Sequence, residues 1–507
     1  MAFVRGDIMK KVLALFLCLA LCLATLPISA RAESGEDVSL PQHTIDRIDA
    51  YVQREMARGK IPGLSIAIVR GDQLVYSAGY GLARDGGEAV TADTPFILGS
   101  ISKAFTALAV RQLVNQGKLQ YSAKVIDYLP WFTTADKGQS DQITVLDLVN
   151  HTSGFSTASG NGRYMGDTYT QEELVRMMND VVLDRPVGAS EEYSNLNYLV
   201  LGQIIETVSG MSYADYIQTN IFDPLDMKHS YTNEPAAQAD GLAAGHRIVY
   251  GYPLQTHIPF PDGNLAHGFL ISSANDMAKF MSLYLTNGYY GKESLVPINV
   301  LMPVDPLRPI AAGEPFYDVY WKPADVTLGY YGHGGATVNY RTDFIVSQSS
   351  RYGVVVLSNV MGDFFTPVVD ASTISAGITL LLAGRMEPKA QPIEISSSGW
   401  TVLITGGVFV LFALLRLVFT RRFLAGIRKG GWRKGLRIGL MVLFDLLLPL
   451  TVIIGLPLRL HVSLIYALQA IPEQAITLEL GTALLLATGI LKLCLLLREH
   501  RRKNKTA

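Results

Sequence analysis

The chain has 507 residues, of which 49% are hydrophobic and 17% are charged, and its formal net charge is -1. This length holds a large domain plus membrane segments, and the mean hydropathy of +0.24 is too high for an ordinary soluble protein. The near-neutral charge does not indicate a nucleic-acid partner.

The N-terminal segment has the pattern of a secretory signal peptide. Basic residues precede an apolar run at 12–26, and Ala30 and Ala32 supply the small residues that a signal peptidase reads. We therefore predict that residues 1–32 are a cleaved signal peptide. An uncleaved anchor is the alternative, but the apolar run is short for a membrane span.

The following region, residues 33–393, contains no cysteine, because the three cysteines of the chain are Cys18, Cys22 and Cys494. No disulfide can stabilise this region, so it needs an ordinary hydrophobic core, which its size allows. A cysteine nucleophile and a cysteine-bound zinc are excluded there. We expect neither a metal nor another cofactor.

Strand-like patterns at both ends of this region enclose a helix-rich middle, which predicts an α+β domain. The antiparallel sheet should be built from both ends, with a helical lobe inserted between them. The expected elements are a helix at 45–56, a hairpin at 64–69 and 74–76, a second hairpin at 344–346 and 353–357, and a closing helix at 367–382.

Ser100-Ile101-Ser102-Lys103 follows a strand-like run at 95–98 and places a hydroxyl and an amine one helical turn apart. A serine hydroxyl needs a base to take its proton when it attacks a carbonyl group. Lys103 can be that base only if its pKa falls from ~10.4, through burial or a neighbouring cation. The backbone N–H groups at a helix start also favour an oxyanion. A simple helix cap at Ser100 is an equal alternative on this motif alone.

Tyr193-Ser194-Asn195 precedes a second helical run at 198–208. A phenol beside Lys103 could pass a proton between the nucleophile and the leaving group, and Asn195 could hold Lys103 or a substrate amide. Each residue also has a structural alternative: Tyr193 as a half-buried aromatic side chain and Asn195 as the cap of the following helix.

His333-Gly334-Gly335-Ala336 lies between apolar runs at 326–331 and 338–345. Paired glycines weaken a strand unless something approaches its backbone closely, so they favour a substrate lying along this edge. The N–H of Ala336 could complete an oxyanion hole with that of Ser100. A plain β-bulge is the alternative.

The C-terminal fifth contains three apolar stretches, each near the ~20 residues that a helix needs to cross a bilayer. Seven basic residues and no acidic one lie between the first two stretches, so this segment and the tail should face the cytoplasm and the domain should lie outside. The basic loop could also bind anionic lipid or a partner. We predict a linker at 394–399, transmembrane helices at about 400–419, 438–458 and 476–497, and a basic tail at 498–507.

Arg416 and Asp445 are ionisable residues inside the first two predicted spans. Charges there are costly, so a mutual ion pair or a functional site is expected, although Arg416 could instead extend to the interface. Glu479 and Lys492 lie near opposite ends of the third span, and we expect both to reach the interfaces. Pro449 is expected to kink the second span.

Together, these motifs resemble the serine β-lactamase and penicillin-binding-protein superfamily, nearest to the class C β-lactamase-like branch that includes D-amino-acid peptidases and carboxylesterases. The resemblance covers about residues 42–385 and implies an antiparallel sheet flanked by helices plus an all-helical lobe. Further matching motifs are Pro62-Gly63, Thr94-Pro95-Phe96, His151-Thr152-Ser153-Gly154, Phe222-Asp223-Pro224-Leu225 and residues 273–276.

The resemblance implies an acyl-enzyme on Ser100, with Lys103 and Tyr193 as the proton-transfer pair. The backbone N–H groups of Ser100 and Ala336 would form the oxyanion hole. Substrate-binding positions would be Asn195, His333, Gly334 and Gly335, whereas His151 would have a structural role in a loop near the site.

One departure from the family pattern bears on the substrate. The best-known β-lactamases have Lys-Thr-Gly where this chain has His333-Gly334-Gly335, as peptidase-type and esterase-type members do. A histidine with an ordinary pKa near ~6.5 is mostly neutral at pH 7 and cannot supply lysine's fixed charge to a drug carboxylate. Efficient β-lactam hydrolysis is therefore not expected.

Three function classes follow from the sequence. The first is a membrane-anchored extracytoplasmic serine hydrolase acting on a peptide, an ester or a cell-wall D-amino-acid bond, with a small molecule or a peptidoglycan-derived peptide as substrate. The second is a receptor, acylated by a cell-wall fragment or a β-lactam, that signals through the transmembrane segments. The third is a transport or assembly subunit whose outer domain only binds, although three spans are few for a transport path.

Overall fold

The computed structural model describes residues 39–506, except for 161–168, 287, 291–292, 295–321, 326–329, 348, 363–368, 387–396, 456–466 and 469–470. The predicted signal peptide lies outside the described residues. So do residues 394–396 of the predicted linker, and the remaining linker residues are helical.

A six-stranded antiparallel sheet forms the centre of the domain, in the order β2-β1-β12-β11-β10-β9. Its first hairpin comes from the start of the domain and its other strands from the end, so that Ile66 of β1 pairs with Val356 of β12. Both predicted hairpins and the α+β class are therefore confirmed. The bounds are β1 (Gly63–Arg70), β2 (Gln73–Gly81), β9 (Lys322–Asp325), β10 (Tyr330–Ala336), β11 (Arg341–Ser347) and β12 (Tyr352–Ser358).

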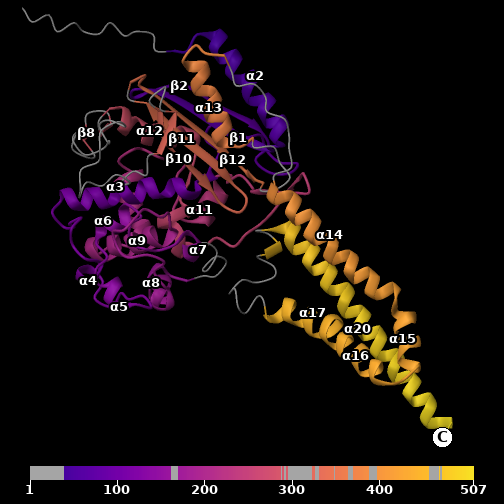
Figure 1. Cartoon of the computed structure of the whole chain (residues 1–507). Coiled ribbons are helices and arrows are strands. Elements are labelled where there is room, and N and C mark those ends of the chain that lie inside the picture. The colour runs from indigo at the N-terminus through magenta and orange to yellow at the C-terminus, as the bar shows by residue number, and fades with distance from the viewer. Residues whose placement is uncertain are drawn as a thin grey trace, which may run out of the picture. The chain divides into compact units, whose positions relative to one another are not determined.

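Helices cover both faces of this sheet, so its central strands are apolar on both sides (Figure 1). Ile66 and Ile68 of β1 pack with helices α2 (Gln42–Gly59) and α13 (Ala371–Leu382), whereas Ala67 and Val69 belong to the larger core on the other side. That side is covered by α12 (Ala274–Leu285), whose N-cap Ser273 accepts a hydrogen bond from the N–H of Asp276.

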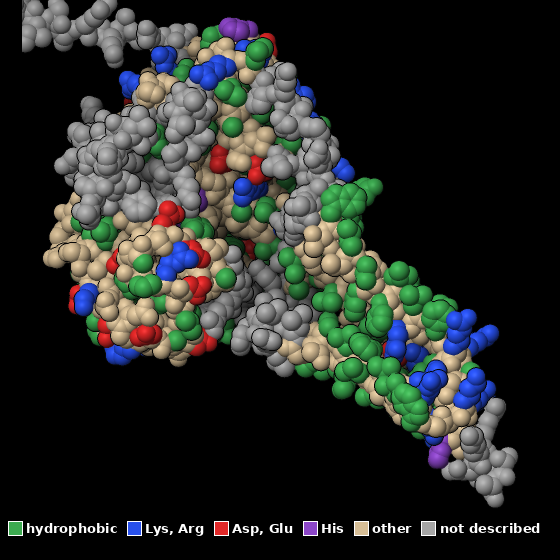
Figure 2. Space-filling view, in the orientation of Figure 1, with side chains coloured by type: hydrophobic (Ala, Val, Ile, Leu, Met, Phe, Trp, Pro, Cys, Tyr) green, Lys and Arg blue, Asp and Glu red, His purple; other side chains and the backbone are tan. Residues whose placement is uncertain are grey.

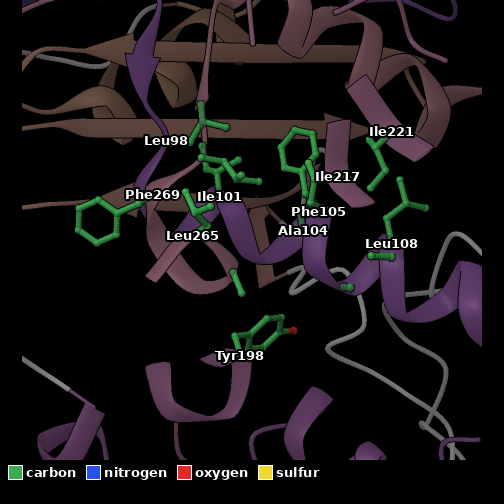
Figure 3. Packing of buried hydrophobic residues seen from close by; sticks show 14 of the residues in the cluster. Leu98, Ile101, Ala104, Phe105, Leu108, Tyr198, Ile217, Ile221, Leu265 and Phe269 are labelled. Carbon is green, nitrogen blue, oxygen red and sulfur yellow. The ribbon is translucent and has the colours of Figure 1, made fainter. Parts of the chain in front are cut away.

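The helical lobe is built around α3 (Ser102–Asn115), which is buried on nearly every side. Figure 3 shows part of the apolar cluster around it, in which Leu98 and Ile101 lie near Leu265 and Tyr198 lies apart from them. A helix that is apolar all round needs neighbours on all sides, and the lobe supplies them. These neighbours include α9 (Asn195–Ser209) and α10 (Tyr213–Ile217). The other helices of this region are α4 (Val125–Tyr128), α5 (Lys137–Ser140), α6 (Val145–Val149), α7 (Thr157–Gly160), α8 (Gln171–Arg176) and α11 (Glu234–Ala239).

Small sheets and turns connect the lobe to the main sheet. The strand-like run expected at 95–98 is a two-residue strand that pairs with a segment just before α12. The short strands are β3 (Phe96–Ile97) with β6 (Ile271–Ser272), β4 (His246–Val249) with β5 (Tyr252–Gln255) and β13 (Val360–Met361), and β7 (Tyr289–Tyr290) with β8 (Glu293–Ser294).

Three C-terminal helical stretches are long and apolar enough to cross a membrane: Gly399–Val418, Trp432–Gly455 and Pro472–Arg501. They overlap the three predicted spans, and the last helix continues through the predicted basic tail to Thr506. The elements are α14 (Ser397–Val418), α15 (Thr420–Arg428), α16 (Trp432–Met441), the π-helical turns η7 (Val442–Leu447) and η8 (Thr451–Gly455), α17 (Leu448–Leu450) and α20 (Pro472–Thr506).

A buried ion triad connects these helices. The Nε of Arg416 lies 2.7 Å from Oδ1 of Asp445, which confirms the predicted pair, and the Nζ of Lys492 lies 2.8 Å from Oδ2. The prediction that Lys492 reaches the interface is wrong, because a fully buried carboxylate provides a closer partner than the membrane surface. The turn η7, which contains Asp445, ends two residues before Pro449, which lacks the N–H that normally bonds four residues back.

Candidate active site

Ser100 lies in a short 3₁₀ turn, η1 (Gly99–Ile101), immediately before α3. It is not the helix cap: the cap position of α3 is Ile101, and no side chain caps that end. Instead, the Oγ of Ser100 lies 2.7 Å from the Oη of Tyr193 and 3.2 Å from the Nζ of Lys103. The hydroxyl is therefore held between an amine and a phenol.

Lys103 is completely buried, although it carries an amine. Its Nζ lies 2.8 Å from Oδ1 of Asn195 and 2.6 Å from the backbone carbonyl of His267, in addition to Ser100. These three partners are uncharged and do not offset the loss of hydration. Burial therefore holds the pKa of Lys103 well below its ordinary value of 10.5.

The three contacts suit a neutral amine. A neutral lysine has two N–H donors and one lone pair, whereas the ammonium ion has three donors and no acceptor. Asn195 and His267 present oxygen acceptors for two donors, which leaves the lone pair for the hydroxyl of Ser100. In that state, Lys103 can accept the proton of Ser100.

Tyr193 contacts both members of this pair. Its phenol is hydrogen-bonded to Ser100, and the Nζ of Lys103 lies 4.9 Å from the centre of its ring. Burial raises the pKa of Tyr193 above its ordinary value of 10. The phenol therefore stays protonated and can relay a proton, but it is a poor candidate for the resting base.

The segment that carries Tyr193 is fixed by His151. The Nδ1 of His151 accepts a hydrogen bond from the N–H of Ser194 at 3.1 Å, and its ring lies 4.8 Å from the ring of Tyr193. Asn195 is the first residue of α9 and makes no capping bond, since its side chain is directed to Lys103. The expected structural role of His151 agrees with this geometry, and the cap alternative for Asn195 is wrong.

One participant is not apparent from the sequence: the π-helical turn η5 (Leu265–Phe269), which carries His267. Burial is the main cause that lowers the pKa of His267 to about 3, so its imidazole is neutral. The ring is held by Asn264 at 2.7 Å, and the nearby N–H of Leu270 bonds the Oγ of Ser102. No spacing rule connects a π turn to a lysine more than 160 residues earlier, so only the fold reveals this contact.

The two glycines around the nucleophile bring separate backbones together. Gly99 has a left-handed φ of 58°, and a Cβ built there would lie 2.5 Å from the backbone N of Ala336. A Cβ on Gly335 would lie 2.0 Å from the carbonyl oxygen of Leu98. The structure therefore brings the backbones of Ser100 and Ala336 beside each other, as two oxyanion-hole donors require.

The strand that carries His333-Gly334-Gly335 is paired with β11 along this stretch, and its register there is unbroken. The bulge alternative is therefore wrong at these residues; the irregularity of β10 lies earlier, between Tyr330 and Tyr331. On its other side, the described residues of β9 pair with Tyr330, Tyr331 and Gly332 of β10. His333 is 6% exposed, and Ala336 is exposed.

A cavity of about 230 Å³ is lined in part by Thr337, the residue after Ala336, whereas Ser100, Lys103 and Tyr193 do not line it. It combines apolar walls with polar and charged groups, which suits a small substrate group of mixed character. The lining includes Arg84, Ile97, Glu234, Gln255, Phe260, Phe269, Thr337, Asn339 and Tyr340.

Comparison with known proteins gives consistent matches. A family model described as Beta-lactamase matches residues 48–376, a segment that contains every candidate site residue. Protein flp of Staphylococcus aureus (strain MW2) is 26% identical over 328 residues, which are 64% of this chain and 65% of that protein. The chain thus spans about 65% of the length of this relative.

Two further matches cover more of their own length. N-acetylmuramyl-L-alanine amidase of Bacillus subtilis (strain 168) is 27% identical over 391 residues, covering 66% of this chain and 85% of that protein. The octameric penicillin-binding protein homologue from Pyrococcus abyssi superposes with a TM-score of 0.56 and 28% identity, covering 67% of this chain and 78% of that one.

Proposed function

The chain belongs to the Beta-lactamase family, and from this premise we propose that it is a membrane-anchored serine hydrolase that forms an acyl-enzyme on Ser100. The observation that carries the proposal is the contact of the Ser100 hydroxyl with both Lys103 and Tyr193. The substrate is a peptide, an ester or a cell-wall D-amino-acid bond. Similarity to a protein named N-acetylmuramyl-L-alanine amidase supports a cell-wall substrate.

In the first step, the Oγ of Ser100 attacks the substrate carbonyl carbon while neutral Lys103 takes its proton. The negative charge on the carbonyl oxygen is stabilised by the N–H groups of Ser100 and Ala336. Collapse of this intermediate breaks the bond to the leaving amine or alcohol. Lys103 returns the proton to the leaving group through the hydroxyl of Tyr193, which leaves a neutral ester on Ser100.

In the second step, water attacks the Ser100 ester and the same groups act in reverse. Tyr193 and Lys103 take one proton from the water, and the released Oγ of Ser100 recovers a proton. The products are the free acid and the original enzyme. Asn195 holds the Nζ of Lys103 throughout, because its Oδ1 can accept from either protonation state of the amine.

In this proposal the substrate lies along His333-Gly334-Gly335, on the strand that leads to Thr337 at the wall of the 230 Å³ cavity. A histidine at the start of this strand motif does not provide the permanent cation that would hold a drug carboxylate. Peptide and ester substrates are therefore favoured over efficient β-lactam hydrolysis.

Intact-mass measurement tests this proposal. The full-length protein in detergent is incubated with a panel of activated esters, D-aminoacyl peptides and penicillin, and peptide mapping locates any adduct. We expect a mass increase on Ser100 that is absent in Ser100→Ala and unchanged in Ser122→Ala, which removes an exposed hydroxyl outside the site. No adduct on a folded protein, or one that persists in Ser100→Ala, would contradict the proposal.

A second candidate rests on the buried triad of Arg416, Asp445 and Lys492, which a simple anchor does not need. In this alternative, the outer domain is a receptor that is acylated by a cell-wall fragment or a β-lactam and signals through the three helices. Exchanging 400–507 for an unrelated anchor distinguishes the two. Unchanged cellular function after the exchange would favour the hydrolase, and lost function with normal Ser100 acylation would favour the receptor.

A further inference from the structure

A cavity of about 620 Å³ lies among the C-terminal helices and combines cationic and apolar walls. Helices α14, α15, α16 and α20 all contribute to it. Its cations are Arg416, Arg422, Arg433, Arg437 and Lys492, and its apolar walls are Phe412, Leu415, Phe419, Phe423, Trp432, Leu436 and Leu440.

We propose that this cavity binds an anionic phospholipid, with the phosphate against the cationic side chains and part of an acyl chain along the apolar wall. The proposal is independent of the hydrolase chemistry at Ser100. Figure 2 shows the cationic side chains gathered at one end of the helical bundle and a hydrophobic surface along the rest of its length. Such a boundary is where the headgroups of a surrounding bilayer meet its hydrocarbon.

The end of the cavity that Arg416 and Lys492 line, called here its inner end, carries a net positive charge. Asp445 bonds both Arg416 and Lys492, so one carboxylate faces two cations. The guanidinium of Arg416 also donates to the backbone carbonyl of Leu440 at 3.1 Å, and its side chain keeps 22% of its surface exposed. Arg416 is therefore fixed in place and still accessible to a ligand.

The opposite end of the cavity, lined by Arg422, Arg433 and Arg437, adds three more guanidinium groups. Within the described part of the chain, no carboxylate forms an ion pair with Arg422, Arg433 or Arg437. Arg437 packs against α15, because a Cβ built on Gly426 would lie 2.2 Å from its Nη1. A lipid phosphate with its attached acyl chain covers both the cations and the apolar walls. A free anion would leave the apolar walls exposed to water, so the lipid is the better match.

Positive charge between two spans also sets membrane orientation, but that role does not need a cavity. Four basic residues of the same segment lie outside the cavity lining: Arg428, which pairs with Glu499, and Arg421, Lys429 and Lys434. All these cations contribute in the same way to membrane orientation, whereas lipid binding depends on those that line the cavity. The two sets therefore form a matched pair of variants.

The test measures lipid retention by native mass spectrometry on the full-length protein, titrated with phosphatidylglycerol or phosphatidylcholine. The cavity variant is Arg422→Gln, Arg433→Gln and Arg437→Gln together. The control is Arg421→Gln, Lys429→Gln and Lys434→Gln together, which removes the same charge. Since one basic residue near an anionic surface contributes a factor of about five in affinity, we expect about a hundredfold weaker phosphatidylglycerol binding in the cavity variant and less than about fivefold in the control.

Three results would overturn the inference: equal losses in both variants, equal retention of the two lipids by the unmodified protein, or displacement of the lipid by millimolar inorganic phosphate. The first indicates diffuse electrostatic attraction, and the third indicates a simple anion site. Thermal melting of both variants checks that the helices remain assembled. If the cavity variant fails to assemble, Arg433→Gln alone is measured, with an expected loss of about fivefold.

Discussion

At the scale of single residues, the environment of Lys103 determines the chemistry. A buried lysine with three uncharged partners loses its proton more easily than one in water, so it can be a base near neutral pH. The pKa of Tyr193 shifts in the opposite direction, upward, because burial favours the neutral phenol. Two groups that are both protonated in water at pH 7 therefore have different roles in the same site.

This difference predicts a pH dependence of acylation. The base form of Lys103 is the active one, so the acylation rate should rise as pH rises through its lowered pKa and then level off well below pH 10.5. Lys103→Arg keeps a permanent cation, and we expect acylation to fall by about 10²–10⁴-fold at every pH. Stopped-flow acylation with an activated ester measures both effects.

The matched control is Lys118→Arg, which makes the same change at an exposed position outside the site. It should leave the profile unchanged. A Lys103→Arg enzyme that retains the same rising limb would show that another group is the base.

Sequence reasoning predicted much of the site at this scale. Ser100 and Lys103 share a helical turn, and their spacing predicts their contact. That Tyr193 and Asn195 contact them depended on the family resemblance, because nothing local connects residues more than 90 positions apart. The carbonyl of His267 and the Lys492 partner of Asp445 were not predicted, since a backbone oxygen has no residue signature and a helix's rotation is set by packing.

At the scale of elements, the nucleophile turn and β10 touch through Gly99 and Gly335. Gly335→Ala would place a methyl group 2.0 Å from the carbonyl oxygen of Leu98, so β10 must move away from the turn. We expect Ser100 acylation to fall by about 10²-fold or more, as for loss of one oxyanion donor. The melting temperature should also fall, since overpacking of this kind costs ~1–3 kcal/mol.

Gly334→Ala is the matched control for stability. Its Cβ would lie 3.4 Å from Oδ1 of Asp343, which is ordinary contact, so the melting temperature should stay close to that of the unmodified protein. Differential scanning calorimetry and the ester assay measure the two effects. If Gly335→Ala melts and reacts like the unmodified protein, the close approach is not required.

Helices and strands were predicted correctly where the hydrophobic periodicity is strong. They were missed where tertiary packing, and not the local sequence pattern, determines the backbone conformation. The hairpins at β1–β2 and β11–β12 have long apolar strands, and α2 has one apolar face. The two-residue pair β3–β6 and the π turn η5 have no such pattern. The closing helix, predicted to start at residue 367, begins at Ala371, where the side chain of Asp370 accepts from the N–H of Thr373.

At the scale of the whole molecule, the proposed orientation places the domain outside the cell and the basic segment between the first two spans inside. In a background that carries Cys18→Ser, Cys22→Ser and Cys494→Ser, single cysteines replace Ser349 in the β11–β12 turn or Lys429 between α15 and α16, both of them exposed. We expect a membrane-impermeant maleimide to label Ser349→Cys in intact cells. Lys429→Cys should react only after permeabilisation, and the reverse pattern would contradict the orientation.

The order of the main sheet also has a consequence for biosynthesis. Because β1 pairs with β12, the first hairpin of the domain has no central partner until almost the entire domain has been synthesised. The helical lobe can collect local contacts earlier, whereas closure of the sheet must wait for the long-range pairing and is expected to be slow. A ribosome that stalls before β12 would leave an apolar strand edge uncovered, so the nascent chain should depend on chaperones most strongly during that interval.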